Sequence, residues 1–270
     1  MNLKFDLNKY LYTYIKMDSN NTISKINRSR YNLKKYLSEE WNTDPIKEYS
    51  DSEIEKLYRT NKPSNSDIYF GNASGCNFTL YHKKIPNHKL HIIYYNFPEL
   101  GSSAVKITKT CSEKLASLYK EGIIENEDSL IVILYDKIPD NLKLAIEDLY
   151  RLGQEELSKS GLNEIIQNEN DLLGDNKYNL SHFKNIHIYH LDSLSVDIMS
   201  HVKVPKHVSI REKPLIEEIL KKSNCRIDQL PILLRTDPIA KILRLSPGDI
   251  CEITRTTQTA GEILYYRVCK

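Results

Sequence analysis

Two stretches of the chain carry residue types that could support metal-dependent chemistry. They are Pro139-Asp140 and, further along, Asp175-Asn176-Lys177. Two carboxylates can hold a divalent metal, and a lysine one spacer away can polarise an attacking water or a phosphate, which is the chemistry of a nuclease. The second stretch lies in an asparagine-rich segment, whereas a nuclease would need it on a central strand. The sequence therefore disfavours a working nuclease, which stays open as an alternative.

The histidines and cysteines offer a second possible site. Cys76, His82, His88 and His91 could in principle bind zinc, but their gaps match no recognised ligand spacing and no C-x-x-C pair is present. Ordinary strand and loop histidines are the favoured interpretation. The chain also has no glycine-rich phosphate loop and no G-x-S-x-G motif. We therefore expect no catalytic residue, no metal ligand and no cofactor.

Composition limits the class of protein. A chain of 270 residues can bury one large or two modest cores. Its five cysteines form no C-x-x-C pair, which favours a reducing intracellular compartment. The longest apolar run, residues 130–135, has the length of a buried strand and is far short of the ~18 residues that suggest a membrane span. A soluble protein without membrane contact is expected.

The charge is unevenly distributed. The whole chain carries a formal +2, but residues 201–270 hold 13 Lys+Arg against 8 Asp+Glu, and residues 1–200 hold 25 against 28. The C-terminal segment is thus +5 and the remainder −3. So small a total argues against a freestanding nucleic-acid binder that depends on neutralising phosphates. The basic excess could face nucleic acid or an acidic protein, or could simply be a solvated surface.

The first 200 residues predict helices followed by alternating strands and helices. Ser50 and Glu53 form a capping-box pattern, and Gly122 and Gly153 stand where helices are expected to stop. A strand, helix, strand order implies a βαβ unit with a parallel strand pair. The expected helices are residues 5–15, 26–41, about 51–58, 105–120 and 141–152, and the expected strands are 68–70, 77–81, 90–97, 129–135 and 185–191. Residues 160–182 are polar, acidic and asparagine-rich, and we interpret them as an insertion that is at least partly mobile.

Local signals are densest near the C-terminus. Pro214 begins an amphipathic helix, and Asp237 can cap a second, short helix that starts at Pro238. Pro247-Gly248 fits the central pair of a type II turn. Two β-rich runs follow, residues 250–255 and 263–268, and predict a closing hairpin.

Six short signals in this region occur in the order and spacing of one known family. They are Val204-Pro205-Lys206-His207, Gln229-Leu230-Pro231, Asp237-Pro238-Ile239-Ala240, Pro247-Gly248-Asp249, Thr259-Ala260-Gly261 and Tyr265-Tyr266-Arg267. The segment resembles the C-terminal assembly domain of the subunit that eukaryotic RNA polymerases I, II and III share, a family with a counterpart in the archaeal RNA polymerase. The resemblance implies an α+β fold. Residues 1–200 would form an N-terminal α/β jaw domain with restriction-endonuclease-like topology, and residues 201–270 a small α+β assembly domain ending in a β-hairpin.

The resemblance also implies a function, that of a non-catalytic polymerase subunit. The C-terminal domain would anchor the chain to the largest subunit beside neighbouring small subunits, in a single copy. The jaw would lie near downstream duplex DNA and touch its phosphates, with Ile138 and Pro139 as DNA-proximal candidates. The candidates for docking are Val204, Pro205, His207, Asp237, Pro238, Tyr265, Tyr266 and Arg267.

Source and location follow less directly. The archaeal counterpart resembles only the C-terminal part, so the long N-terminal part favours a eukaryote, with the protein in the nucleus, or a large DNA virus, with the protein in the virion and host cytoplasm. The bias towards Asn, Lys, Ile and Tyr favours the virus. A polymerase-independent adaptor that uses the same C-terminal module is a further alternative.

The proposed division of labour predicts the effect of two deletions. Removing residues 201–270 should release the chain from polymerase, whereas removing residues 160–182 should not. Co-purification of the tagged chain with the largest polymerase subunits measures both. If the chain that lacks residues 201–270 still co-purifies with polymerase, the anchor has been assigned to the wrong part of the chain.

Overall fold

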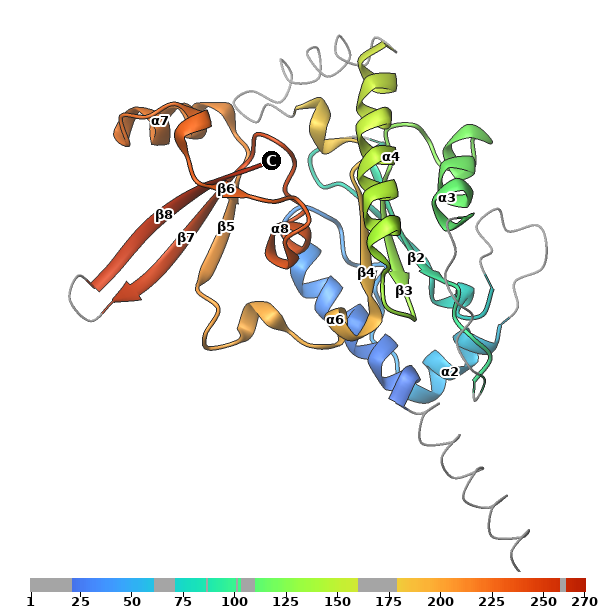
Figure 1. Ribbon diagram of the computed structural model, residues 1–270. Coiled ribbons are helices and arrows are strands. Elements are labelled where there is room, and N and C mark those ends of the chain that lie inside the picture. Colours follow the sequence, from blue (N-terminus) through green and yellow to red (C-terminus); the bar gives the residue numbers. More distant parts are fainter. Residues whose placement is uncertain are drawn as a thin grey trace, which may run out of the picture. The chain divides into compact units, whose positions relative to one another are not determined.

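The computed structural model describes residues 21–60, 71–85, 87–100, 102, 110–159, 179–257 and 261–270. Within them the fold is mixed α+β, as the resemblance implies, and it contains two four-stranded sheets (Figure 1). The chain divides into two compact units. Unit 1 comprises Met1–Leu149 and Ile188–Val196, and unit 2 comprises Tyr150–His187 and Asp197–Lys270. Packing thus groups Tyr150–His187 with the C-terminal segment, and a domain boundary near residue 200 stays a prediction.

The described elements alternate along the chain. Residues 21–37 are helical. The named helices are α2 (Asp51–Arg59), α3 (Thr110–Lys120), α4 (Asp140–Lys159), α6 (Leu191–Ser195), α7 (Lys213–Lys222) and α8 (Pro238–Ile242). The strands are β1 (Phe78–Tyr81), β2 (Lys89–Tyr95), β3 (Ser129–Leu134), β4 (Ile186–His190), β5 (Lys206–Ile210), β6 (Ile232–Leu233), β7 (Ile250–Thr257) and β8 (Gly261–Cys269). Single 3-10 turns occupy Ser74–Cys76, Leu180–His182, Ile198–Ser200 and Ile227–Gln229.

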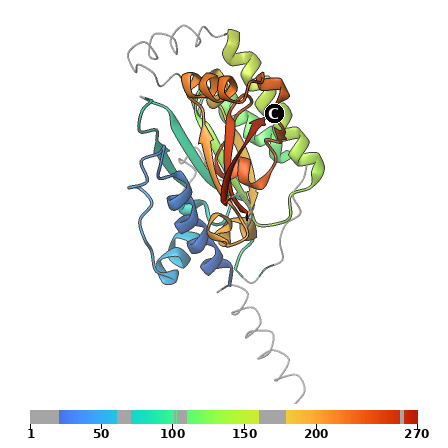
Figure 2. The ribbon, with the colours of Figure 1, turned by 90° about the vertical axis from the view of Figure 1, so that its left-hand side faces the viewer.

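The first sheet has the order β1-β2-β3-β4. β1 runs antiparallel to β2, and β2 runs parallel to β3 with α3 between them, which confirms the predicted βαβ unit. Every residue of β3 is buried because both faces of the sheet are covered. Adjacent residues of β2 show this: the Tyr94 hydroxyl lies 2.9 Å from the Ser29 hydroxyl on the helix of residues 21–37, and Tyr95 contacts Cys111 on α3. Figure 2 shows these two helices on opposite sides of the sheet.

In unit 1, the predicted start of α2 is confirmed, and the predicted bounds of the preceding helix are corrected. Ser50 caps α2, and the Glu53 carboxylate accepts from the Ser50 amide at 2.8 Å, which completes the capping box. The helix predicted over residues 26–41 instead includes residue 21 and ends at 37. Trp41 forms an isolated bridge to His82 beyond its end. The helix predicted over 5–15, the strand over 68–70 and most of the 160–182 segment lie outside the described residues.

Gly153 was predicted to end a helix, and that prediction is wrong. α4 continues through it to Lys159. A Cβ at this position would lie 2.7 Å from Cδ of Lys184, whose side chain is almost fully buried and pairs with Glu156 at 2.8 Å. The glycine is needed here for close packing, a demand that comes from a residue distant in the sequence.

The second sheet has the order β5-β7-β8-β6 and belongs to unit 2. β7 and β8 form the predicted antiparallel hairpin, and the Asp249 amide donates to Ser246 O at 3.0 Å to close the preceding turn. Gly248 has φ of +98°, as the central glycine of a type II turn requires. α7 and α8 also form as predicted, and α8 ends at Ile242.

The two faces of this sheet have separate apolar clusters. On one face, Ala240 of α8 packs with Cys251, Ile253 and Cys269 of the hairpin. On the other, Ile250 and Val268 pack against α7. No residue of α7 is buried, so the second face is only partly covered. The α8 face therefore holds the tighter core of the unit.

A glycine in unit 1 supports a prediction of stability. An added Cβ on Gly75 would lie 2.2 Å from the Leu57 carbonyl oxygen near the end of α2, a backbone atom that cannot move aside cheaply. We expect Gly75→Ala to destabilise the protein by about 2 kcal/mol or more, since overpacking against fixed atoms costs about 1–3 kcal/mol. Denaturant unfolding measures the effect. Lys56→Ala, at an exposed position of α2, is the matched control, and an equally small effect for both variants would contradict the steric argument.

Candidate functional site

The C-terminal unit is supported by one buried carboxylate. Asp249 is 1% exposed, and its Oδ1 lies 2.8 Å from Nε2 of His182. Its Oδ2 accepts from Nε of Arg211 at 3.3 Å and from the Ser246 amide at 2.8 Å. Burial alone would raise the pKa of this carboxyl, but His182, Arg211 and the Ser246 amide outweigh it and hold the pKa below the ordinary 3.8. Asp249 is thus ionised and fully paired.

Two buried arginines extend this network. Arg235 donates to Asn185 Oδ1 at 2.9 Å and to Ile186 O at 2.7 Å, and its guanidinium lies 3.8 Å from the centre of the Tyr150 ring. Arg244 donates to the Asn185 carbonyl at 3.0 Å. Residues of the segment Tyr150–His187 therefore provide the hydrogen-bond acceptors and the aromatic ring that contact these two buried arginines of the C-terminal segment.

His187 lies beside the same arginines. Burial is the main cause that lowers its pKa well below the ordinary 6.5, and the positive charges of Arg235 and Arg244 lower it further. The ring is therefore neutral at physiological pH. His190, at the end of β4, is half-buried, so the two strand histidines, at odd spacing along the strand, differ in environment.

The second sheet has an open edge. β6 pairs with β8 only at Val268 and Cys269. Within the described part of the chain, the preceding residues of β8 have no strand partner on that side. Large apolar side chains are exposed nearby: Ile232 49%, Leu234 61%, Leu264 50% and Tyr265 42%. An unpaired edge beside exposed apolar side chains is a surface suited to protein docking.

Several docking candidates share one face of the sheet. His207 and Tyr265 both stand opposite Ile253 in the strand register, and Arg267 stands opposite Cys251. These residues lie on the face that α8 covers. The Arg255 guanidinium lies 5.2 Å from the Tyr265 ring centre, within reach of a cation–π contact.

The remaining candidates have other positions. Asp237 caps α8, where its carboxylate accepts from the Ile239 amide at 2.8 Å, and Pro238 is the first helical residue. The Asp237 carboxylate tends to raise the pKa of His207, although burial, the larger effect, lowers that pKa overall. Tyr266 stands opposite Glu252 on the other face. The structure thus joins most of the candidates on one face and separates Tyr266 from them.

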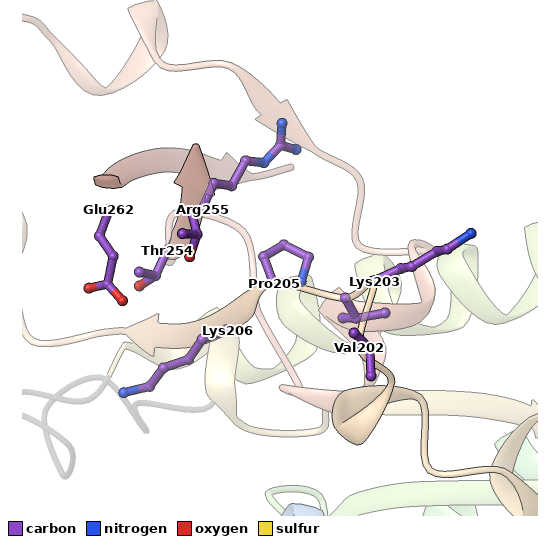
Figure 3. Close-up of a pocket in the computed structure, with 9 residues that line it drawn as sticks. Val202, Lys203, Pro205, Lys206, Thr254, Arg255 and Glu262 are labelled. Atoms are coloured by element: carbon purple, nitrogen blue, oxygen red, sulfur yellow. The ribbon is translucent and has the colours of Figure 1, made fainter. Parts of the chain in front are cut away.

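Val204 and Pro205 line a pocket at the other edge of the sheet (Figure 3). Its lining comprises Val202, Lys203, Val204, Pro205, Lys206, Thr254, Arg255, Thr256 and Glu262. Of its charged residues, only Lys206 belongs to one of the six family signals. No local pattern marks Lys203, Arg255 and Glu262 as neighbours, because only the strand register brings them to one edge.

The loop before α4 holds the two DNA-proximal candidates, Ile138 and Pro139, which are both half-buried. The Pro139 carbonyl accepts from the Leu142 amide at 3.1 Å and so starts the helix. Asp140 is exposed and pairs with Lys143 at 2.8 Å. The second half of the nuclease pattern, Asp175 to Lys177, lies outside the described residues.

The histidines considered as zinc ligands have other partners. The rings of His82 and His88 lie 4.9 and 5.0 Å from the ring of Trp41. His91 lies 3.0 Å from the Asp128 carboxylate and 3.0 Å from the Thr79 hydroxyl, and so links β1, β2 and the start of β3. In the described ranges, no three His, Cys, Asp or Glu residues are grouped as a metal site would require. All five cysteines are free thiols, and no described helix is long and apolar enough to cross a membrane.

Comparisons with known proteins identify the C-terminal part. Residues 196–269 match the family described as "RNA polymerase Rpb5, C-terminal domain". The DNA-directed RNA polymerase subunit Rpo5 of Nitrosopumilus maritimus is 47% identical over 70 residues, which cover 26% of this chain and 83% of that protein. The Rpo5 of Methanosphaera stadtmanae is 39% identical over 77 residues, 28% of this chain and 99% of the relative. The Rpo5 of Thermococcus kodakarensis is 44% identical over 72 residues, which cover 27% of this chain and 87% of that protein.

These relatives define a class of protein, the non-catalytic subunits of multisubunit DNA-directed RNA polymerases. The chain belongs to the Rpb5/Rpo5 family of that class, the subunit that eukaryotic RNA polymerases I, II and III share. It therefore assembles with other polymerase subunits.

The paired Asp249 predicts an acid-sensitive contribution to stability. Asp249→Asn should destabilise unit 2 by about 3–5 kcal/mol at neutral pH, because it removes the buried negative charge that pairs with His182 and Arg211. The folded pKa lies below the unfolded value, so the contribution is complete above about pH 5 and is lost as the pH falls below 3.8 towards the folded pKa. The variant should lack this acid-dependent loss.

Urea unfolding between pH 3 and pH 7 measures both effects. Asp228→Asn is the matched control, since this exposed carboxylate pairs with the exposed Arg226. Exposed pairs contribute about 0–1 kcal/mol. An equal loss in the two variants, or an unchanged pH profile for Asp249→Asn, would refute the assignment.

Proposed function

We propose that residues 201–270 anchor the chain to the largest polymerase subunit, beside neighbouring small subunits and in a single copy. The observation that carries this proposal is the open edge of β8 within the matched residues. A partner strand added to such an edge gains main-chain hydrogen bonds, and pockets for alternate side chains set its register. Leu264 and Ile232 are apolar anchors beside it.

Rigidity of the unit also supports docking. The hairpin begins directly after Asp249, whose carboxylate is held by three groups. The Arg235 and Arg244 contacts fix the adjoining segments. A preorganised surface loses less conformational entropy when it binds.

We further propose that residues 1–200 form part of the lower jaw beside downstream DNA. The parallel β2–β3 pair, with helices on both faces of its sheet, fits an α/β jaw of restriction-endonuclease-like topology. The loop at Ile138 and Pro139 would lie nearest the duplex, and the exposed Lys137 beside it could meet a phosphate. Such contacts position DNA without reading its sequence.

Polymerase subunits work inside the cell with the transcription machinery. The archaeal relatives are covered almost completely by the C-terminal quarter of this chain, so the long N-terminal part is an addition to what they share. Together with the Asn, Lys, Ile and Tyr bias, this supports a large DNA virus as the source, with the chain in virion and host cytoplasm, ahead of a eukaryotic nucleus.

The docking edge can be tested by substitution. We expect Leu264→Lys combined with Ile232→Lys to reduce recovery of the two largest polymerase subunits about tenfold or more, since edge lysines oppose strand addition and a lost anchor costs about 1.4 kcal/mol or more. Both positions are half exposed, so the fold should persist. Affinity purification of the tagged chain from its native cell, followed by quantitative mass spectrometry, measures recovery.

Leu144→Lys is the matched control, because Leu144 is 68% exposed on α4 in unit 1. It should leave recovery unchanged. Full recovery with the double variant would move the anchor away from the β8 edge. If the wild-type chain is recovered alone, it is an adaptor and the polymerase proposal fails. These substitutions are cleaner than deletions, because removing residues 160–182 also removes His182, the partner of Asp249.

A further inference from the structure

The pocket in Figure 3 lies at one end of the β5–β7 pairing, where β5 begins and β7 continues. β5 and β7 pair from Ile210 opposite Ile250 to Lys206 opposite Thr254. β7 continues beyond this point, paired with β8 on its other side. Arg255 and Thr256 therefore have no strand partner on the β5 side among the residues that the structure describes.

Pro205 explains why β5 begins late. It stands where the next residue opposite β7 would be, and a proline has no N–H to donate to a ladder. The chain before it turns, with the Val204 amide donating to His201 O at 2.8 Å. The turn leaves a slot beside β7, bounded by Val202 to Lys206.

The slot presents charge on both faces of the sheet. Lys206 stands opposite Thr254, and Glu262 stands opposite Thr256, so these side chains share one face, whereas Arg255 lies on the other. Figure 3 shows Arg255 pointing away from Lys206 and Glu262. Lys203 adds a third positive charge to the lining, against the single carboxylate of Glu262.

Among the residues that the structure describes, these cations have no acidic partner. Lys203, Lys206 and Arg255 make no ion pair with any residue in the described ranges. The side chain of Val202 is fully exposed at the slot's outer wall. The lining is thus a short strand-sized gap with unpaired positive charge and one uncovered apolar side chain.

We propose that this slot binds an extended, acidic segment of a neighbouring polymerase subunit, which adds as a strand beside Arg255 and Thr256. Neighbouring residues of a strand point to opposite faces, so two consecutive acidic residues could meet Arg255 on one face and Lys206 on the other. The inference rests on the proposed function, because it takes the segment from a polymerase subunit. It adds a second contact, at the sheet edge opposite to the proposed anchor.

Site-specific photo-cross-linking in cells tests the slot. Thr256, exposed on its floor, is replaced by p-benzoylphenylalanine, and adducts are formed before purification and identified by mass spectrometry. We expect one major adduct, to a polymerase-subunit segment with carboxylates within about three residues. The same replacement at Glu217, exposed on α7, is the control and should not yield that adduct.

Charge reversal sharpens the test. Arg255→Glu with Lys206→Glu, in the Thr256 probe background, should reduce the adduct about tenfold, through two partly exposed charge pairs that are lost and made repulsive. Lys213→Glu with Lys221→Glu, both exposed on α7, is the matched control and should preserve it. Lysines in place of the partner's carboxylates should restore the adduct with the reversed slot.

The outcomes separate this inference from the proposed function. Recovery of the largest subunits with no Thr256 adduct, or with an adduct to DNA or to a segment without carboxylates, overturns the slot and leaves the polymerase role intact. An adduct to a protein outside polymerase, without recovery of the largest subunits, overturns both. A subunit adduct that is insensitive to charge reversal rejects the acidic partner.

Discussion

The second unit depends on an ionised carboxylate that water does not reach. Asp249 follows the Pro-Gly turn and precedes the long hairpin, so its position sets where the hairpin starts. A buried charge is costly unless other groups satisfy it. Arg211, which directly follows β5, and His182, from the 3-10 turn Leu180–His182, both contact it. One side chain thereby links three stretches that are far apart in the sequence.

This linkage shows how the N-terminal addition is combined with the segment that archaeal relatives possess. Those relatives align over 70 to 77 residues, which is most of their own length. In this chain the corresponding segment also buries Arg235 and Arg244 against Asn185. The shared segment thus has internal charges whose partners come from residues 150–187. The addition is part of the C-terminal core as well as a separate α/β unit.

What the sequence predicted well was governed by local chemistry. The Ser50–Glu53 capping box, the Asp237 cap and the Gly248 turn each involve residues within a few positions of one another. The parallel β2–β3 pair follows from element order. Gly153 misled because the reason for it is Lys184, about thirty residues away. A contact of that range leaves no local pattern.

The docking candidates likewise include features that the sequence could predict and features that depend on distant contacts. Motif residues such as Tyr265 and Arg267 could be selected by resemblance, but their placement on one face with His207 depends on strand register. Asp249 was recognised only as part of the Pro247-Gly248-Asp249 signal, and its pairing was missed because its partner His182 lay in a segment interpreted as an insertion. The pocket beside Pro205 depends on how far β5 extends, which composition does not determine.

The shortness of β6 has a consequence for the chain before it is assembled. Within the described ranges, two residues of pairing leave most of β8 with open main-chain groups on the side away from β7, next to Leu264 and Tyr265. Natural proteins usually protect such an edge, since it can pair with a second copy and start aggregation. A newly synthesised orphan copy is therefore at risk of self-association for as long as it stays unassembled. Cells that make it in excess would need to remove the surplus or shield it with a chaperone.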